Sequence, residues 1–132
     1  TTKRYSELDI KYFIKKGWKV WTVSATDKFG DYGIIGLIMV EPKDIGWDIH
    51  NFLMSCRILG RGIEDTAVKF ILKQAEKNNI KSIFAKYIPS SKNIQANDFW
   101  EKQGFRYEGY AAEGIRGGEG KIVEKRYHFF IS

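Results

Sequence analysis

The clearest chemical signal in the sequence is a group of arginines and glycines. It lies between a largely apolar stretch and a segment with helical spacing. Arg57, Gly60 and Gly62 follow the pattern Arg-x-x-Gly-x-Gly, directly after residues 47–56. The first amide N–H groups of a helix have no partner within the helix and carry a partial positive charge, so they bind phosphate oxygens. Glycines let the backbone approach such a ligand, and Arg57 and Arg61 can add charge-assisted hydrogen bonds. The pattern predicts a phosphate-binding turn, with a plain strand-to-helix turn as the alternative.

A second pattern follows one expected strand later, where residues 93–105 read NIQANDFWEKQGF. The two patterns, in this order, resemble the R/Q-x-x-G-x-G/A and N-x(n)-A-x-x-F-Y-x-x-x-G-F signatures of the GNAT acyltransferase superfamily. The resemblance implies an α/β fold, α+β by some schemes, in three layers with a mixed, splayed central sheet flanked by helices. It also implies a cofactor: acetyl-CoA or another acyl-CoA, or the phosphopantetheine of a carrier protein.

The second pattern departs from the superfamily at Trp100. Many GNAT enzymes have a tyrosine there, whose hydroxyl can protonate the leaving thiolate. An indole N–H donates a hydrogen bond but is not a usable acid, so the departure argues against tyrosine-type acid catalysis at this position. We therefore assign no catalytic side chain from the sequence.

A closer resemblance covers residues 20–40, 52–62 and 87–93. These segments are similar to the C-terminal domain of FkbH-like proteins, in which an upstream domain of the HAD-like subfamily IIIC loads a glyceryl unit onto an acyl carrier protein in polyketide and related biosynthesis. The resemblance implies an upstream HAD-like domain and an acyl carrier protein as partners. Residues 1–132 are then one GNAT-like domain, the C-terminal part of a longer protein.

The GNAT resemblance assigns cofactor contacts to two segments. The exposed strand edge would pair with the amides of the pantetheine arm, the turn would hold the phosphates, and the second pattern would flank the arm on its other side. The expected contacts are Leu53, Met54, Ser55, Cys56, Arg57, Leu59, Gly60, Arg61, Gly62, Ile63, Asn93 and Trp100.

Alternation, helical spacing and punctuating residues predict the elements that must position these groups. Ser6 can cap a first helix that ends at Gly17, and Pro42 and Pro89 are expected to end the stretches before them. Apolar residues at Ile63, Ala67, Phe70, Ile71 and Ala75 form the stripe of a helix that lies on a sheet. The expected helices are 7–16, 63–78 and 93–103, and the expected strands are 18–25, 34–41, 47–56, 81–88, 105–111 and 122–131. A hairpin connection should occupy 28–33, and the sheet should be largely antiparallel at its start and parallel at its centre.

Other candidate groups have simpler explanations. Cys56 could be a thioester nucleophile, but a lone cysteine in a strand is more often a small buried residue. His50, two residues after Asp48, could accept a proton, although a surface pair at a strand edge is more common. His50 and His128 have no partner at metal-ligand spacing, so we expect no metal. The glycine-rich residues 113–120 lack the P-loop pattern and predict a hairpin connection.

Composition excludes several classes of protein. The chain has 132 residues, 43% hydrophobic and 29% charged, which fits one folded domain. No apolar run approaches the length of a membrane span, and the single cysteine favours a reducing, cytoplasmic location. Eight basic and three acidic residues lie between 56 and 92. No nucleic-acid-binding signature accompanies this charge, so an acidic protein or a phosphorylated cofactor is the expected partner.

Three functions remain open at this stage. The first is an acyltransferase-like domain that binds acyl-CoA or a carrier protein within an FkbH-like protein. The second is a docking domain without activity that presents an acidic carrier protein to an upstream active site, consistent with the basic segment and with Trp100. The third is a small-molecule N-acetyltransferase that uses acetyl-CoA.

Overall fold

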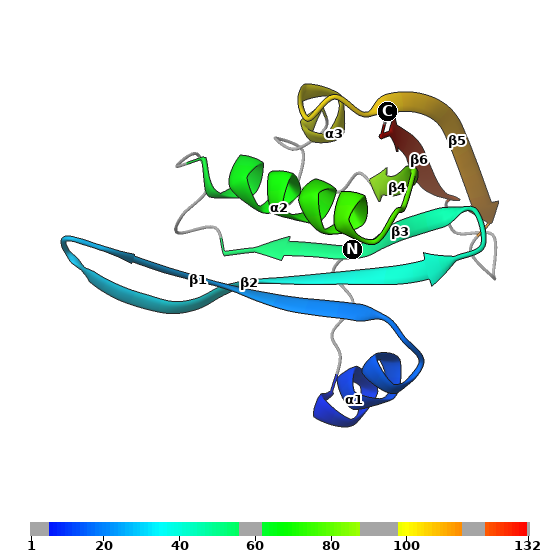
Figure 1. The fold of residues 1–132 in the computed structure, drawn as a ribbon. Coiled ribbons are helices and arrows are strands. Elements are labelled where there is room, and N and C mark those ends of the chain that lie inside the picture. Colours follow the sequence, from blue (N-terminus) through cyan, green and yellow to red (C-terminus); the bar gives the residue numbers. More distant parts are fainter. Residues whose placement is uncertain (1–5, 56–61, 88–97, 115–120, 132) are drawn as a thin grey trace.

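The computed structural model describes residues 6–55, 62–87, 98–114 and 121–131, which form three helices and six strands (Figure 1). In chain order they are α1 (Glu7–Lys15), β1 (Lys19–Asp27), β2 (Gly30–Lys43), β3 (Gly46–Met54), α2 (Ile63–Lys77), β4 (Ser82–Tyr87), α3 (Phe99–Lys102), β5 (Arg106–Gly114) and β6 (Lys121–Phe130). In this part of the chain no helix is long and apolar enough to cross a membrane.

The strands form one mixed sheet in the order β1-β2-β3-β4-β6-β5. Only the central pair, β3 with β4, runs parallel among the described strands, and the other neighbours run antiparallel. Helix α1 lies on one side of the strands, and α2 and α3 lie on the other (Figure 1). The expected fold class, a mixed sheet flanked by helices, is confirmed.

The first helix begins and ends where the local sequence predicts. The Ser6 hydroxyl accepts from the amide of Asp9, and the Asp9 carboxylate accepts from the amide of Ser6, which together form a capping box. Gly17 follows the helix with a φ of 92°. None of the residues of α1 is buried, and the helix is held to the sheet mainly through Phe13, whose ring stacks on Trp18 at 4.2 Å.

The β1–β2 hairpin is longer and tighter than expected. Strand β2 begins at Gly30 rather than after Gly33, because the Asp27 carboxylate accepts from the amide of Phe29 and closes the chain into a short turn. The strand also continues past Pro42 to Lys43. At Pro42, β2 pairs with β3 alone, because its ladder with β1 ends at Val40. The missing N–H of the proline therefore removes no hydrogen bond to β1.

The core lies between the sheet and α2. The buried residues of α2 are Ala67, Val68, Ile71 and Ala75, and Ile38, Val40, Ile49 and Ile83 of the sheet belong to the same cluster. The buried face of α2 is therefore rotated slightly from the predicted stripe. Val68 is buried, whereas Phe70 remains 39% exposed at the side of the helix. Both residues are apolar, so the helical spacing alone could not choose between them.

The C-terminal elements also differ in length from the prediction. The described part of the third helix is a single turn that begins at Phe99, and the expected start near Asn93, like Pro89, lies outside the described residues. Gly104, with a φ of 90°, follows this turn as expected. Strands β5 and β6 form the expected antiparallel pair, although β5 begins at Arg106 and extends to Gly114.

Candidate functional site

Strands β3 and β4 lie side by side at their beginnings and then separate. Their ladder consists of Trp47 with Ile83 and Asp48 with Phe84, and no later pair joins them in the described ranges. Strand β3 keeps its ladder with β2 as far as Met54. From Ile49 to Met54 the edge of β3 that faces β4 therefore has no strand partner among the described residues, which leaves backbone groups there for a ligand.

A glycine allows the close contact at the joined end. A Cβ atom built on Gly46 would collide with the carbonyl oxygen of Ser82, and Gly46 has a φ of 144°, which side chains disfavour. Only glycine fits both conditions without strain. Gly46 thus brings the start of β3 against the start of β4 and sets the point from which the strands diverge.

A β-bulge in β3 follows the last β3–β4 pair. Met39 pairs with Asn51 and its neighbour Val40 pairs with Ile49, so His50 is the additional residue on β3. The His50 ring is half-buried and makes an edge contact with Trp18, with 4.9 Å between the ring centroids. The bulge changes the directions of the backbone amides next to the open edge.

The structure brings two groups of the predicted site residues to the same end of the molecule. Leu53 and Met54 end β3 and Ser55 follows, with its amide donating to the carbonyl of Ile35 at 2.7 Å. Gly62 and Ile63 begin α2. Cys56, Arg57, Leu59, Gly60, Arg61 and Asn93 lie outside the described residues, so their predicted contacts stay predictions.

Gly62 is the N-cap of α2 and adopts a left-handed conformation, with a φ of 77°. Among the residues that the structure describes, no side chain caps this helix end, and a Cβ atom on Gly62 would meet nothing within 4 Å. Glycine is thus needed for the backbone conformation, and the space next to it is open. The first turn also carries Glu64 and Asp65, whose negative charges oppose an anion bound at this end.

Trp100 lies in the core. Its side chain is only 5% exposed, and its ring contacts Phe52 of β3 at 5.4 Å and Phe105 at 5.0 Å between centroids. The ring of Phe99 packs beside Trp100 and Phe52. Below, we call Phe52, Phe99, Trp100 and Phe105 the aromatic cluster. Because the cluster joins β3 to α3, it holds the separated strand in place through side chains.

A hydrogen bond connects the two helices on this face. The side-chain amide of Gln103, which follows α3, donates to the carboxylate of Asp65 in the first turn of α2. It fixes the N-terminal end of α2 relative to α3.

Sequence reasoning named His50 as a possible proton acceptor but missed the bulge at this residue, and it missed Gly46 and Phe52 as parts of this arrangement. Gly46 follows an Asp-Ile pair in a polar turn, which signals a turn but not a close approach to a distant strand. The bulge at His50 shows in the sequence only as two adjacent polar residues, His50 and Asn51, which interrupt the alternation. In the sequence, Phe52 looks like an ordinary strand residue.

Two tyrosines beside this site have perturbed acidity. Burial raises the pKa of Tyr127, and Glu101, Tyr107, Tyr87 and Asp98 raise it further, while burial alone raises the pKa of Tyr87. The Tyr127 hydroxyl is buried and has no hydrogen-bond partner among the described residues. Both phenols therefore stay protonated beyond their ordinary range.

Cavities between described residues also lie away from the open edge of β3, and two of them are large. One, of about 460 Å³, lies between α2 and β1 and is bordered by Gly62 and Ile63. The other, of about 450 Å³, is lined by charged residues that include Lys43, Asp48 and Arg126. Lys43 and Asp48 form an ion pair of 3.2 Å there. No group of three metal-ligating side chains occurs within the described segments.

No protein-family model matches the sequence, and no curated protein sequence matches it. Solved structures do match. A candidate acetyltransferase of the GNAT family from Desulfovibrio desulfuricans superposes with a TM-score of 0.70 at 14% identity, covering 99% of this chain and 86% of that chain. The chain has the GNAT fold.

Other structures with this fold carry more specific descriptions. The ribosomal-protein-S18-alanine N-acetyltransferase of Escherichia coli has a TM-score of 0.73 at 11% identity, covering 99% of this chain and 80% of that chain. A candidate streptothricin acetyltransferase of Bacillus anthracis, solved with acetyl coenzyme A, has a TM-score of 0.65 at 19% identity. This match covers 76% of our chain, which spans only 57% of the Bacillus anthracis protein. The GNAT fold agrees with the resemblance seen in the sequence, and the closer resemblance to FkbH-like proteins stays a prediction.

Proposed function

We propose that this chain binds acetyl-CoA or another acyl-CoA and transfers the acyl group to a small-molecule amine. The observation that carries the proposal is the separation of β3 from β4 directly before a bulge, next to the uncapped N-terminus of α2. The Bacillus anthracis protein with the same fold was solved with acetyl coenzyme A, which supports this class of cofactor.

The cofactor would bind along two parts of the chain. Pantetheine contains amides, and the edge of β3 from Ile49 to Met54, which has no strand partner among the described residues, would offer them backbone donors and acceptors, as an edge strand does for a peptide. The phosphates would lie at Gly62 and Ile63, where the first amides of α2 have no side-chain cap and the space beside Gly62 is open.

Positioning and backbone hydrogen bonds would supply the catalysis. A thioester supplies an activated acyl group, and the amine must be held against its carbonyl carbon. Backbone amides of β3 along the open edge would donate to the carbonyl oxygen as it gains charge. Trp100 cannot supply a proton, since an indole is not an acid in this range and its ring is buried in the aromatic cluster.

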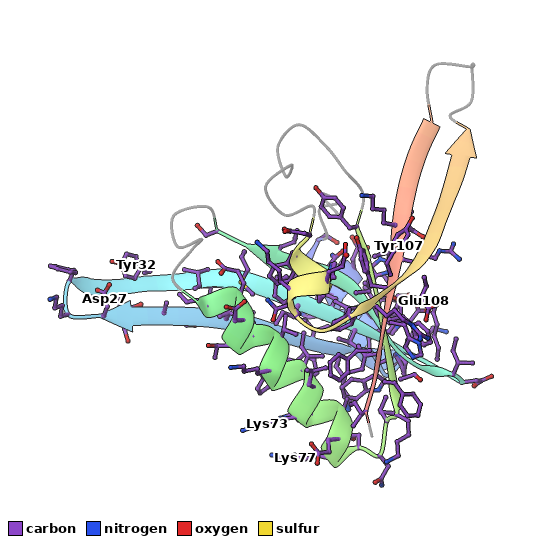
Figure 2. All side chains as sticks on the ribbon, turned by 90° about the horizontal axis from the view of Figure 1, so that it is seen from above. Asp27, Tyr32, Lys73, Lys77, Tyr107 and Glu108 are labelled. Carbon is purple, nitrogen blue, oxygen red and sulfur yellow. The ribbon has the colours of Figure 1, made fainter. Side chains whose placement is uncertain are left out.

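A second function is favoured by Trp100 and by the surface of α2. With no usable acid at Trp100, this domain would dock an acyl carrier protein for an upstream HAD-like domain, as its resemblance to FkbH-like proteins implies. Lys69, Lys73 and Lys77 are exposed on α2, and Figure 2 shows Lys73 and Lys77 pointing away from the sheet. These cations suit an acidic carrier protein.

Calorimetric titration separates the two proposals. The ligands are acetyl-CoA, free CoA and a phosphopantetheinylated carrier protein, and the proteins are wild type, Gly62→Asp and Gly62→Asn. Aspartate and asparagine are similar in size and both tolerate the left-handed conformation, so they differ here mainly by one negative charge. We expect acetyl-CoA to bind the Asn variant about tenfold more tightly than the Asp variant.

Each outcome has a distinct meaning. Binding of acetyl-CoA that depends on the charge at position 62, with turnover on a panel of amines, supports the N-acyltransferase. Binding of the carrier protein alone, equal in both variants, contradicts the phosphate site and supports the docking domain. Equal binding of acetyl-CoA by both variants would place the phosphates elsewhere.

A further inference from the structure

Strand β1 is an unusually regular edge of the sheet. It pairs with β2 along its whole length and has no partner strand on its other side among the described residues. Both irregularities of the hairpin fall on β2, where Ile35 and Tyr32 are the additional residues. The outer edge of β1 therefore presents a row of backbone donors and acceptors uninterrupted by a bulge in β1 itself, which is a template for another strand.

The usual protection of such an edge is absent from the middle of β1. Its two charged residues, Lys19 and Asp27, stand at its first and last positions. The seven residues between them contain neither charge nor proline, and they are Val, Trp, Thr, Val, Ser, Ala and Thr. Charges and prolines inside an edge strand are the features that normally prevent pairing between molecules.

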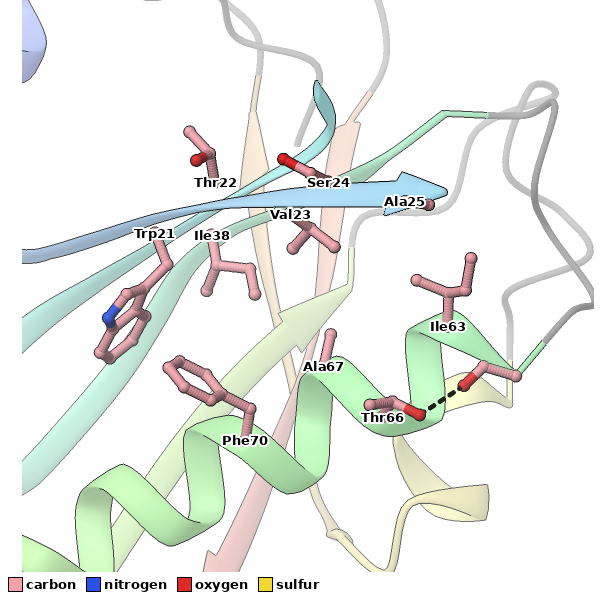
Figure 3. A pocket seen from close by; sticks show the side chains of 11 residues that line it. Trp21, Thr22, Val23, Ser24, Ala25, Ile38, Ile63, Thr66, Ala67 and Phe70 are labelled. Atoms are coloured by element: carbon pink, nitrogen blue, oxygen red, sulfur yellow. Dashed lines mark hydrogen bonds between the residues drawn. The ribbon is translucent and has the colours of Figure 1, made fainter. Parts of the chain in front are cut away.

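The face of β1 toward α2 is incompletely covered. A cavity of about 460 Å³ separates the strand from the helix, with Trp21 and Val23 on one wall and Phe70 and Ala67 on the other (Figure 3). The Trp21 ring reaches Phe70 in an edge contact at 5.2 Å. Apolar side chains thus continue to the free edge of the sheet.

The sequence of β1 is complementary to itself in one antiparallel register. When Val23 lies opposite Val23 of a second copy, Lys19 lies opposite Asp27, Trp21 opposite Ala25 and Thr22 opposite Ser24. Both ends then join opposite charges, and the large tryptophan faces the smallest side chain of the strand. We propose that β1 pairs with β1 of a second copy in this register, which extends the sheet across a two-fold axis at Val23.

The hairpin turn holds one of the two charges in place. The Asp27 carboxylate accepts from the amide of Phe29 at 2.8 Å and from the Tyr32 hydroxyl at 2.9 Å. Figure 2 shows Asp27 and Tyr32 near the far end of the hairpin. Because the interface is isologous, each Lys19–Asp27 contact occurs twice, and a single substitution changes both.

Charge inversion tests the register. Sedimentation velocity over a concentration series is measured for wild type, Lys19→Glu, Asp27→Lys and an equimolar mixture of the two variants. Wild type is expected to dimerise, and each variant alone should dimerise about tenfold more weakly, since like charges then face each other twice. The mixture should recover the wild-type affinity, because both contacts of the heterodimer join opposite charges. Lys28→Glu, outside the ladder, is the matched control.

Cross-linking tests the two-fold axis. Opposite Cα atoms in an antiparallel pair are about 4.5–5.5 Å apart, which suits a disulfide. In a Cys56→Ser background, Val23→Cys should form a covalent dimer on oxidation, whereas Val20→Cys, expected opposite Thr26, should not. A monomeric wild type at all concentrations overturns the proposal. So does a dimer that ignores both charge inversions, which would use another surface, or one that cross-links equally at positions 20 and 23.

Discussion

The two ends of the β3–β4 pair are held together by different interactions. At the joined end, two ladder pairs connect the strands and Gly46 packs directly against the backbone of Ser82. At the open end, no ladder bond joins the two strands in the described ranges. There β3 is held to α3 by the contact of Phe52 with Trp100. Backbone contact fixes one end, and side-chain packing fixes the other.

This difference shows how a sheet can open without losing its core. The open edge of β3 leaves backbone groups for a ligand, while the aromatic cluster holds this part of β3 to α3. We therefore expect an added atom to lower the stability of the joined end, and the loss of an aromatic ring to lower the stability of the open end.

The largest expected effect is the loss of the ring at the open end. Trp100→Ala should lower the free energy of unfolding by about 4 kcal/mol, because it removes a buried ring and leaves a cavity among three other rings. Urea unfolding followed by circular dichroism measures this loss. Trp100→Phe should lose less than half as much, and an equal loss in both variants would contradict the role of packing.

At the joined end, Gly46→Ala should cost about 3 kcal/mol, since the new methyl group meets the Ser82 carbonyl in a backbone conformation that alanine disfavours. Gly30→Ala is a matched control, with a φ of 145° and no atom within 4 Å of its Cβ. It should cost about 1 kcal/mol through the conformation alone. Equal losses in urea unfolding would show that the close approach to Ser82 is unimportant.

A smaller effect is expected at the N-terminus of α2, beside the open end. A buried carboxylate oxygen of Glu64 has no hydrogen-bond partner in the described part of the chain, and its charge lies in the first turn of α2, where the proposed phosphates would bind. Glu64→Gln should tighten acetyl-CoA binding about threefold in calorimetry. Glu76→Gln, near the other end of the helix, should leave the affinity unchanged. Weaker binding by Glu64→Gln would contradict the position of the phosphates.

The smallest effect concerns pH just past the last β3–β4 pair, where Tyr127 of β6 pairs with Ala85 of β4. Burial raises the pKa of Tyr127 above its unfolded value of 10.0, so its neutral form is favoured in the fold. The resulting stability is complete below pH 10 and is lost as the pH rises through the folded pKa. Tyr127→Phe should therefore show a shallower alkaline loss of unfolding free energy than wild type. Identical alkaline profiles would exclude this contribution.

Local chemistry made much of the fold predictable. The capping box of Ser6 with Asp9 and the stop at Gly17 depend on neighbouring residues, so the first helix was located nearly to the residue. Helical spacing located α2 but could not distinguish Val68 from Phe70, because burial depends on where the sheet lies.

The arrangement of the site was less accessible from the sequence. The separation of β3 from β4 depends on contacts between residues far apart in the chain, such as Gly46 with Ser82, and no local pattern records them. Gly62 was expected to bind phosphate through its lack of a side chain, and the structure adds a left-handed backbone as a second reason for glycine. Its contact with a cofactor stays a prediction.

The additional residue at His50 changes the phase of the strand. Before it, the odd-numbered Trp47 and Ile49 face the core, and after it the even-numbered Phe52 and Met54 do. In a regular strand of the same sequence, without the bulge, Phe52 and Met54 would turn to the opposite face. Deleting His50 would remove the bulge and keep the pairing of Phe52 and Met54 with β2. The bulge therefore acts as a phase correction, which lets one additional residue enter β3 without exchanging the two faces of the strand.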